Sequence, residues 1–223
     1  MNFKQYMNIG NPDQLRLPRC PLFVLAVLVA FQPLFSLAQD KGTYQQEADR
    51  LAVLLYWQPT STVADIGAGH GQLTLAAAKR VGKIYSTELD DKLVTNLQQL
   101  AETEKNIVPV KATETETNLP PASCDSIFMR LVYHHFTKPT EMDASLFHAV
   151  KPGGLLAVID EEPPANSKSP EGVPQNRGGH GMPQELLVEE LTSAGFQVVQ
   201  TVDDWPNHSY CTVFRKPNLL GVP

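Results

Sequence analysis

The stretch Val63-Ala64-Asp65-Ile66-Gly67-Ala68-Gly69-His70-Gly71 decides how this chain folds. The apolar and β-branched residues 62–66 predict a short buried strand that ends at a turn of alternating glycines. The alanine-rich residues after the turn, 72–81, predict a helix. Gly67 and Gly69 allow the backbone to approach a ligand closely. The amino end of the predicted helix offers free N–H groups and positive potential to a carboxylate or a phosphate.

Strands and helices alternate along the chain on both sides of this turn. The remaining predicted strands cover residues 83–87, 107–111, 124–129, 155–159, 196–202 and 209–215. The remaining predicted helices cover residues 44–57, 91–104, 141–150 and 183–194. This alternation indicates a parallel sheet with helices on both faces. Between these elements, residues 161–181 hold four prolines and four glycines without periodicity, which predicts either a lid or a surface insertion.

The glycine turn by itself is compatible with a dinucleotide site. The dinucleotide fingerprint requires glycine at the first, third and sixth positions, and the sixth position counted from Gly67 is Gln72. An acid, Asp65, also stands two residues before the first glycine. A nicotinamide-dependent oxidoreductase is therefore the disfavoured interpretation.

The pattern Asp-x-Gly-x-Gly-x-Gly over residues 65–71 resembles motif I of class I S-adenosylmethionine-dependent methyltransferases. Glu88 follows the second predicted strand, where a carboxylate can accept hydrogen bonds from both ribose hydroxyls. Residues 124–136 and 149–156 are similar to the family's segments at the fourth and fifth strands. Together the matches cover about residues 44–216, and they are most similar to the ubiquinone/menaquinone-biosynthesis-like branch, which methylates small molecules.

The resemblance implies a Rossmann-like α/β fold with a seven-stranded, mostly parallel sheet of order 3-2-1-4-5-7-6 and helices on both faces. It implies S-adenosylmethionine as the cofactor and methyl transfer to an unidentified small-molecule acceptor. The cofactor-binding residues that it implies are Asp65, Gly67, Ala68, Gly69, Glu88, Leu89, Thr113 and Arg130. One departure concerns adenine: the acid that the family usually carries after the third strand is replaced by Ala112-Thr113, and Glu114 comes one residue later.

Three histidines are candidates for the acceptor side of the site. His134 follows the fourth predicted strand and is a candidate general base, with His135 and His180 as further candidates, because histidine can accept a proton near neutral pH. A packing or capping role for each histidine stays open. We expect no metal site, since no pair of these histidines has the i, i+4 spacing of a helical metal motif.

The amino-terminal residues 1–38 differ in character from the domain predicted over residues 39–223. Lys4, Arg16 and Arg19 precede an apolar run, and Ser36-Leu37-Ala38 then supplies the small residues that a signal peptidase reads. We therefore predict a signal peptide and an exported protein, periplasmic or secreted; the alternative is a membrane anchor through residues 20–37.

The predicted location and the net charge limit the possible functions. The formal net charge is −6 and no run of basic residues stands out, so we expect a small-molecule substrate and no nucleic-acid partner. The membrane would be a partner only through an uncleaved amino-terminal segment. Exported proteins meet little S-adenosylmethionine, so the alternative function is a catalytically inactive exported binding protein that kept the methyltransferase fold.

Overall fold

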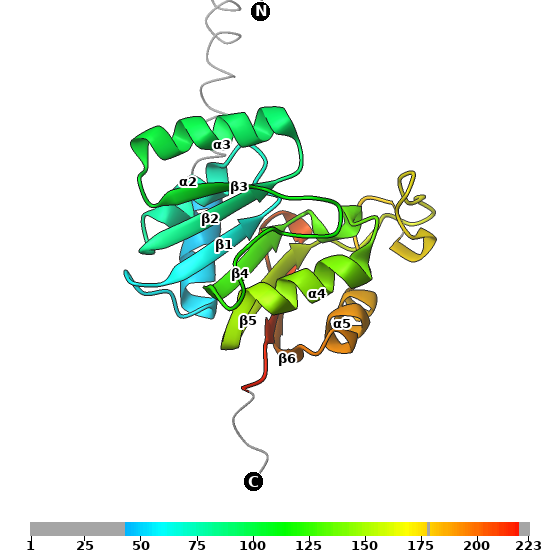
Figure 1. Ribbon diagram of the computed structural model, residues 1–223. Coiled ribbons are helices and arrows are strands. Elements are labelled where there is room, and N and C mark those ends of the chain that lie inside the picture. Colours follow the sequence, from blue (N-terminus) through cyan, green and yellow to red (C-terminus); the bar gives the residue numbers. More distant parts are fainter. Residues whose placement is uncertain (1–42, 178, 219–223) are drawn as a thin grey trace, which may run out of the picture. The chain divides into compact units, whose positions relative to one another are not determined.

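A seven-stranded sheet in the order β3-β2-β1-β4-β5-β7-β6 runs through the domain (Figure 1). The computed structural model describes residues 43–177 and 179–218, so the predicted signal or anchor lies outside the described residues. The strands are β1 Thr62–Ile66, β2 Lys83–Glu88, β3 Ile107–Lys111, β4 Cys124–Arg130, β5 Val150–Asp160, β6 Gln197–Val202 and β7 Tyr210–Arg215. The first five strands are parallel, while β7 is antiparallel to both of its neighbours. This sheet confirms the predicted fold and strand order.

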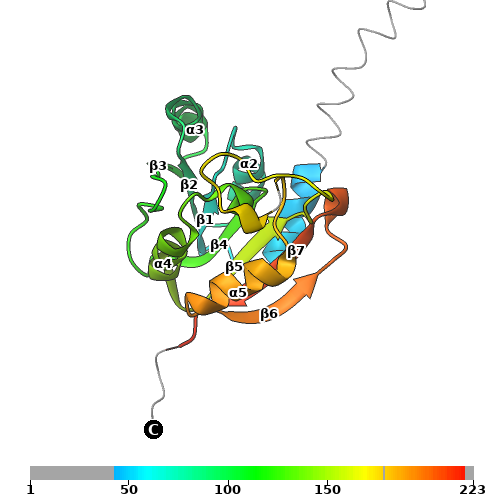
Figure 2. The same ribbon diagram turned by 90° about the vertical axis from the view of Figure 1, so that its right-hand side faces the viewer.

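Helices cover both faces of the sheet. They are a helix over residues 43–54, α2 Gln72–Ala78, α3 Asp91–Thr103, α4 Pro139–Ala149 and α5 Gln184–Ser193. The first helix, α2 and α3 pack on one face, and α4 and α5 pack on the other. Figures 1 and 2 show the blue first helix and α4 on opposite sides of the sheet. Within the described residues, no helix combines the length and apolar character needed to cross a membrane.

Strand β4 shows why the middle of a central strand is apolar on both sides. Its side chains alternate between the two faces, so Ile127 and Met129 pack with α4 and α5, while Phe128 packs with the first helix and α2. All three residues are fully buried. A parallel strand that is covered on both faces has no solvent-exposed side, and its sequence therefore lacks the polar–apolar alternation of a half-exposed strand.

The structure extends β5 beyond its predicted start at Leu155. Val150 already pairs with Cys124 of β4, and the register then shifts before the regular pairing resumes at Leu155. The proline and glycines at residues 152–154 favour a turn in the sequence. In the structure Gly153 has a positive φ of 78° within a bulge of β5, and it donates its N–H to the carbonyl of Lys216, 2.9 Å away.

Candidate functional site

The glycine turn joins β1 to α2, and its backbone requires glycine. Gly67, Gly69 and Gly71 all have positive φ, at 66°, 57° and 78°. A Cβ on Gly67 would lie 2.6 Å from Val132 Cγ2, and a Cβ on Gly71 would lie 2.5 Å from Leu100 Cδ1. A Cβ on Gly69 would meet nothing within 4 Å. The turn is thus tightly packed at its two ends and open in the middle, where a ligand can approach the backbone.

Glu88, the last residue of β2, lies against this turn. Its Oε2 accepts the backbone N–H of Gly69 at 3.0 Å, and its Oε1 accepts the backbone N–H of Leu89 at 2.8 Å. These two bonds fix the carboxylate next to the open middle of the turn. Each carboxylate oxygen can accept a further hydrogen bond, so Glu88 can bind a pair of neighbouring hydroxyl groups.

Asp65, in β1, is almost fully buried at 3% exposure. The pKa of its carboxyl is raised to about 7. Burial and the negative charge of Glu88 raise this pKa, while a 2.6 Å hydrogen bond from Thr74 Oγ1 and the charge of Arg130 partly offset the rise. A buried carboxyl with a raised pKa ionises readily once a cation comes close. Asp65 can therefore bind an ammonium group.

Two pockets meet at the glycine turn and share Gly67. The larger, of about 260 Å³, is lined by Ile66, Gly67, Thr87, Glu88, Leu89, Ala112, Thr113, Glu114, Val132, His135, Phe136, Thr137 and Met142. The smaller, of about 240 Å³, is lined by Tyr44, Asp65, Gly67, Ala68, Gly69, His70, Gln72, Leu73 and Arg130. All eight residues that the sequence assigned to the cofactor line one or both pockets, so the structure brings them together.

The segment after β3, where the family's usual acid is missing, also reaches the larger pocket. Ala112, Thr113 and Glu114 all line it, and the backbone N–H of Ala112 donates to the carbonyl of Glu88 at 2.9 Å. The hydroxyl of Thr137 donates to Glu114 Oε2 at 3.3 Å. Glu114 thus offers a carboxylate at the pocket wall, one residue later than the family pattern.

The three candidate histidines come together at one side of the larger pocket. His134 and His135 belong to the 3-10 turn η1 Tyr133–His135, and His180 lies in the loop after β5. The ring centroids of His134 and His135 are 4.1 Å apart. The ring centroid of His180 lies 6.1 Å from that of His134 and 6.0 Å from that of His135. Of the three, His135 lines the pocket, whereas His134 is 97% buried and its Nδ1 lies 2.8 Å from Asp160 Oδ1.

The structure also adds polar residues that the sequence interpretation missed. Arg130 Nε donates to Glu47 Oε2 at 2.8 Å, and Glu47 is fully buried. The sequence could have indicated Glu47, because it lies four residues before Leu51 on the apolar face of the first helix, where a charged side chain is unusual. Thr74 carries a weaker signal, as a hydroxyl within the buried alanine-rich face of α2.

Comparisons with known proteins agree with this geometry. Residues 64–158 match the family model described as a methyltransferase domain. Over these residues the chain is similar to a methyltransferase domain. Because this match is joined by the strand order and by the two carboxylates beside the glycine turn, S-adenosylmethionine is the cofactor indicated for the domain.

The individual relatives that this chain matches are distant or partial. A probable ribosomal RNA small subunit methyltransferase A of Methanosarcina acetivorans is 32% identical over 99 residues, which cover 41% of this chain and 36% of that protein. The chain spans less than half the length of the curated relatives that it matches.

Solved structures share the fold of this domain at low sequence identity. A SAM-dependent methyltransferase from Aquifex aeolicus has a TM-score of 0.63 at 22% identity over 76% of this chain and 89% of its own. The cyclase SpnF has a TM-score of 0.66 at 16% identity over 78% and 82%. Proteins with this fold thus include one named for a different reaction, so the reaction of this chain depends on its own site and not on the fold alone.

Proposed function

We propose that this domain transfers a methyl group from S-adenosylmethionine to a small-molecule acceptor. The observation that carries the proposal is the pair of pockets that share Gly67, with Asp65 in the smaller pocket and Glu88 in the larger. Asp65 in the smaller pocket suits the ammonium group of the methionine part, and Glu88 in the larger pocket suits the two ribose hydroxyls. The open side of Gly69 leaves room for the ligand between them.

The side of the larger pocket that holds His134, His135 and His180, here called the histidine side, would then contact the acceptor. When bound, S-adenosylmethionine supplies a methyl group activated by the positive charge of its sulfonium. Partial burial lowers the pKa of His135, and the neighbouring His134 and His180 lower it further. A neutral His135 at the pocket wall can accept a proton from an acceptor hydroxyl, amine or thiol at neutral pH. His134, held by Asp160, supports the orientation of the turn that carries His135.

A small acceptor fits the chain better than RNA does. The part of the larger pocket beyond the carboxylate is lined by apolar side chains of Leu89, Val132, Phe136 and Met142. The chain has a formal net charge of −6, which opposes binding to a phosphate backbone. The apolar lining is compatible with an acceptor like those of the ubiquinone/menaquinone-biosynthesis-like branch. The RNA methyltransferase names among the relatives make RNA the alternative acceptor to test.

Calorimetry of the full chain with S-adenosylhomocysteine tests the cofactor site. Glu88→Ala is expected to weaken binding by about 1.5–3 kcal/mol, as for a hydrogen bond to a charged group. Glu102→Ala, which removes an exposed acid from α3, is the matched control and should bind like the unchanged chain. Equal affinities for both variants would remove Glu88 from the site, and tighter binding of NAD would contradict the proposal as a whole.

Methyl transfer itself needs a separate measurement. Radiolabelled S-adenosylmethionine can be offered with a small-molecule extract and with RNA, and the label followed into each fraction. Label in the small molecules supports the proposal, while label in RNA assigns the alternative acceptor. Binding of S-adenosylhomocysteine without any label transfer favours the catalytically inactive exported binding protein.

We also propose that residues 1–38 direct export, on the basis of the basic residues, the apolar run and Ser36-Leu37-Ala38. Amino-terminal sequencing of the protein from its native host should give a chain that starts at Gln39. A chain that starts at Met1 in the membrane fraction would favour the anchor through residues 20–37. The same chain in the soluble fraction would contradict both.

A further inference from the structure

The three histidines form a cluster that could bind a metal ion as well as transfer a proton. One ligand nitrogen from each of His134, His135 and His180 lies within 4.8 Å of the others. We propose that these three side chains bind one divalent transition-metal ion, with Zn²⁺ as the reference ion, beside the larger pocket. This inference goes against our expectation from the sequence, which rested on helical spacing and did not foresee that the loop after β5 brings in His180.

The first argument is the way His134 is held. Its Nδ1 lies 2.8 Å from Asp160 Oδ1, and its backbone N–H donates to Asp160 Oδ2 at 3.3 Å. Asp160 Oδ1 also accepts the backbone N–H of Glu161 at 2.9 Å, and both Asp160 and His134 are buried. A carboxylate on one ring nitrogen fixes the tautomer and leaves the other nitrogen, Nε2, with a free lone pair. Metal-binding histidines are typically held in this way.

The second argument is the placement of His180. Buried contacts hold the chain in place both before and after this residue. Before it, Arg177 is fully buried and its guanidinium pairs with Glu190 Oε2 at 2.7 Å. After it, the backbone of Met182 donates to the carbonyl of Glu161 at 2.8 Å and accepts from the hydroxyl of Tyr210 at 2.7 Å.

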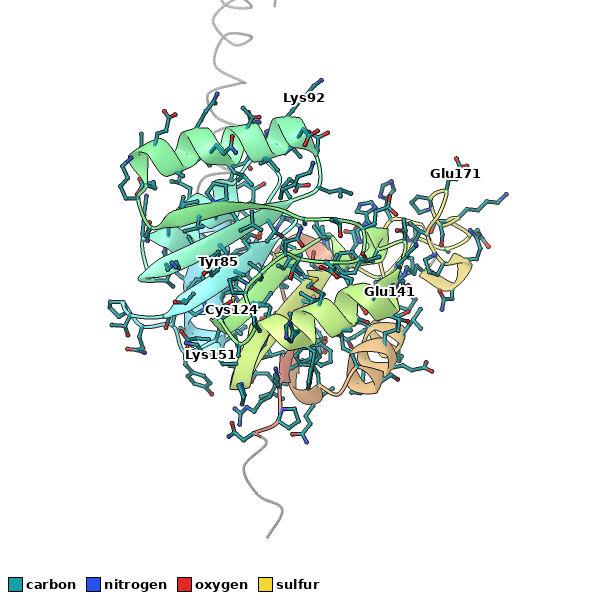
Figure 3. All side chains as sticks on the ribbon, viewed as in Figure 1. Tyr85, Lys92, Cys124, Glu141, Lys151 and Glu171 are labelled. Carbon is teal, nitrogen blue, oxygen red and sulfur yellow. The ribbon has the colours of Figure 1, made fainter. Side chains whose placement is uncertain are left out.

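The residues on either side of His180 also pack too closely to be anything but glycine. A Cβ on Gly179 would lie 2.7 Å from Ser167 Cβ, and a Cβ on Gly181 would collide with the carbonyl of Glu161. The loop tip around Glu171 extends away from the domain (Figure 3), so the returning segment, and not the tip, delivers His180 to the cluster.

The third argument is the ligand set itself. Three neutral imidazoles suit zinc, copper, iron and nickel, whereas magnesium and calcium prefer oxygen. Ligand bonds of about 2.1 Å require nitrogens about 3.4 Å apart in a tetrahedral site, somewhat closer than the present upper limit of 4.8 Å. His135 and His180 are exposed and can adjust their side chains, while the buried His134 stays fixed.

Three protein ligands characterise catalytic sites that leave a fourth position open. Because His135 also lines the larger pocket, that position would be reached by an acceptor in the pocket. A hydroxyl or thiol of the acceptor would form a bond to the ion through its lone pair, and its proton would pass to water. His135 would be the proton acceptor only in the metal-free domain, because its free lone pair is used once it binds the ion. This role in activating the acceptor rests on the proposed methyl transfer; binding of the ion does not.

A metal titration of the full chain tests the site without any cofactor. The chain is treated with EDTA, dialysed and titrated with Co²⁺, followed by visible absorption and calorimetry, and then with Zn²⁺ as a competitor. We expect one equivalent of ion. His134→Ala, His135→Ala and His180→Ala should each weaken binding at least 100-fold, and Asp160→Asn by about 10- to 100-fold. His148→Ala, an exposed histidine on α4 outside the cluster, is the matched control and should bind like the unchanged chain.

Binding that the three alanine variants leave unchanged, or no stoichiometric binding by the folded chain, would overturn the site. Circular dichroism checks that each variant is folded, and His180→Ala alters an exposed side chain, so it keeps the test valid if His134→Ala does not fold. Titration with S-adenosylhomocysteine separates the two proposals. Metal binding without S-adenosylhomocysteine binding leaves the metal site standing alone, and the reverse outcome removes the metal site alone.

Discussion

The two sides of the larger pocket are built in different ways. On the glycine side, the bonds that shape the site join residues close in the chain: Asp65 binds Thr74 nine residues later, and Gly69 binds Glu88 nineteen residues later. On the histidine side, His134 binds Asp160 across 26 residues, and the hydroxyl of Tyr133 binds Glu190 across 57. The hydrogen bonds of the Asp65 and Glu88 carboxylates thus lie within one β-α-β unit, whereas the histidine side exists only after several distant elements have packed.

The histidine side also contains buried charged groups that are incompletely paired. The hydroxyl of Tyr133 lies 2.9 Å from both Asp143 Oδ2 and Glu190 Oε2, and Arg177 pairs with Glu190. Burial raises the pKa of Asp143 to about 7, and Nε of Arg177 and Oδ1 of Asp143 have no partner among the described residues. A partly satisfied buried network stabilises less than a fully satisfied one. We therefore expect the loop to open more readily than the glycine turn.

The largest effect is expected from Gly67→Ala, a change on the glycine side of the site. Positive φ costs about 1–2 kcal/mol for a non-glycine residue, and the clash with Val132 adds about 1–3 kcal/mol as overpacking. The free energy of unfolding, measured in urea, should fall by about 2–5 kcal/mol. Gly69→Ala, with a similar φ but no neighbour for its Cβ, should lose only about 1–2 kcal/mol. Equal losses would mean that close packing does not define the turn.

The next largest effect is expected from Glu190→Gln, which tests the loop anchor. This change leaves the guanidinium of Arg177 buried without its ion pair, which costs about 3 kcal/mol in comparable cases. The loop over residues 161–181 should then be cut faster by protease, and methyl transfer should fall, while S-adenosylhomocysteine binding stays unchanged. Glu189→Gln, an exposed neighbour on α5, is the control. Loss of cofactor affinity in Glu190→Gln would show that the two sides are not independent.

The smallest effect is the pH dependence that Asp65 confers on cofactor binding. In the free domain the carboxyl has a pKa of about 7, so it carries a proton at lower pH. An ammonium group favours the ionised form, so binding releases that proton. Affinity for S-adenosylhomocysteine should therefore rise with pH up to about 7, by at most about 1.4 kcal/mol per unit, and then level off.

Two variants sharpen this pH prediction. Asp65→Asn should flatten the profile between pH 5.5 and 8. Thr74→Val removes the hydrogen bond that lowers the pKa of Asp65, so the midpoint should move to higher pH. Calorimetry in buffers of different ionisation enthalpy measures the released proton directly. A flat profile in the unchanged chain would place the cofactor's amino group away from Asp65.

The sequence by itself indicated the alternating strands and helices, and its resemblance to the methyltransferase family implied the strand order and the eight residues that line the two pockets. Runs of apolar residues, the glycine turn and Glu88 at the end of a strand are local features, and the hydrogen bonds of the Asp65 and Glu88 carboxylates lie within one β-α-β unit. The physical reason is that local backbone requirements, such as the positive φ of Gly67, restrict which residues can occur.

Only the tertiary structure decided the histidine side. Neither the spacing of His134, His135 and His180 nor the composition of residues 161–181 indicates that three imidazoles meet. The 44 residues between His135 and His180 could follow many paths. The path is set by the burial of Arg177 against Glu190 and by the bonds of Met182 to Glu161 and Tyr210. These contacts depend on α5, β5 and β7 packing together. Side chains brought together by such packing leave no periodic signal in the chain.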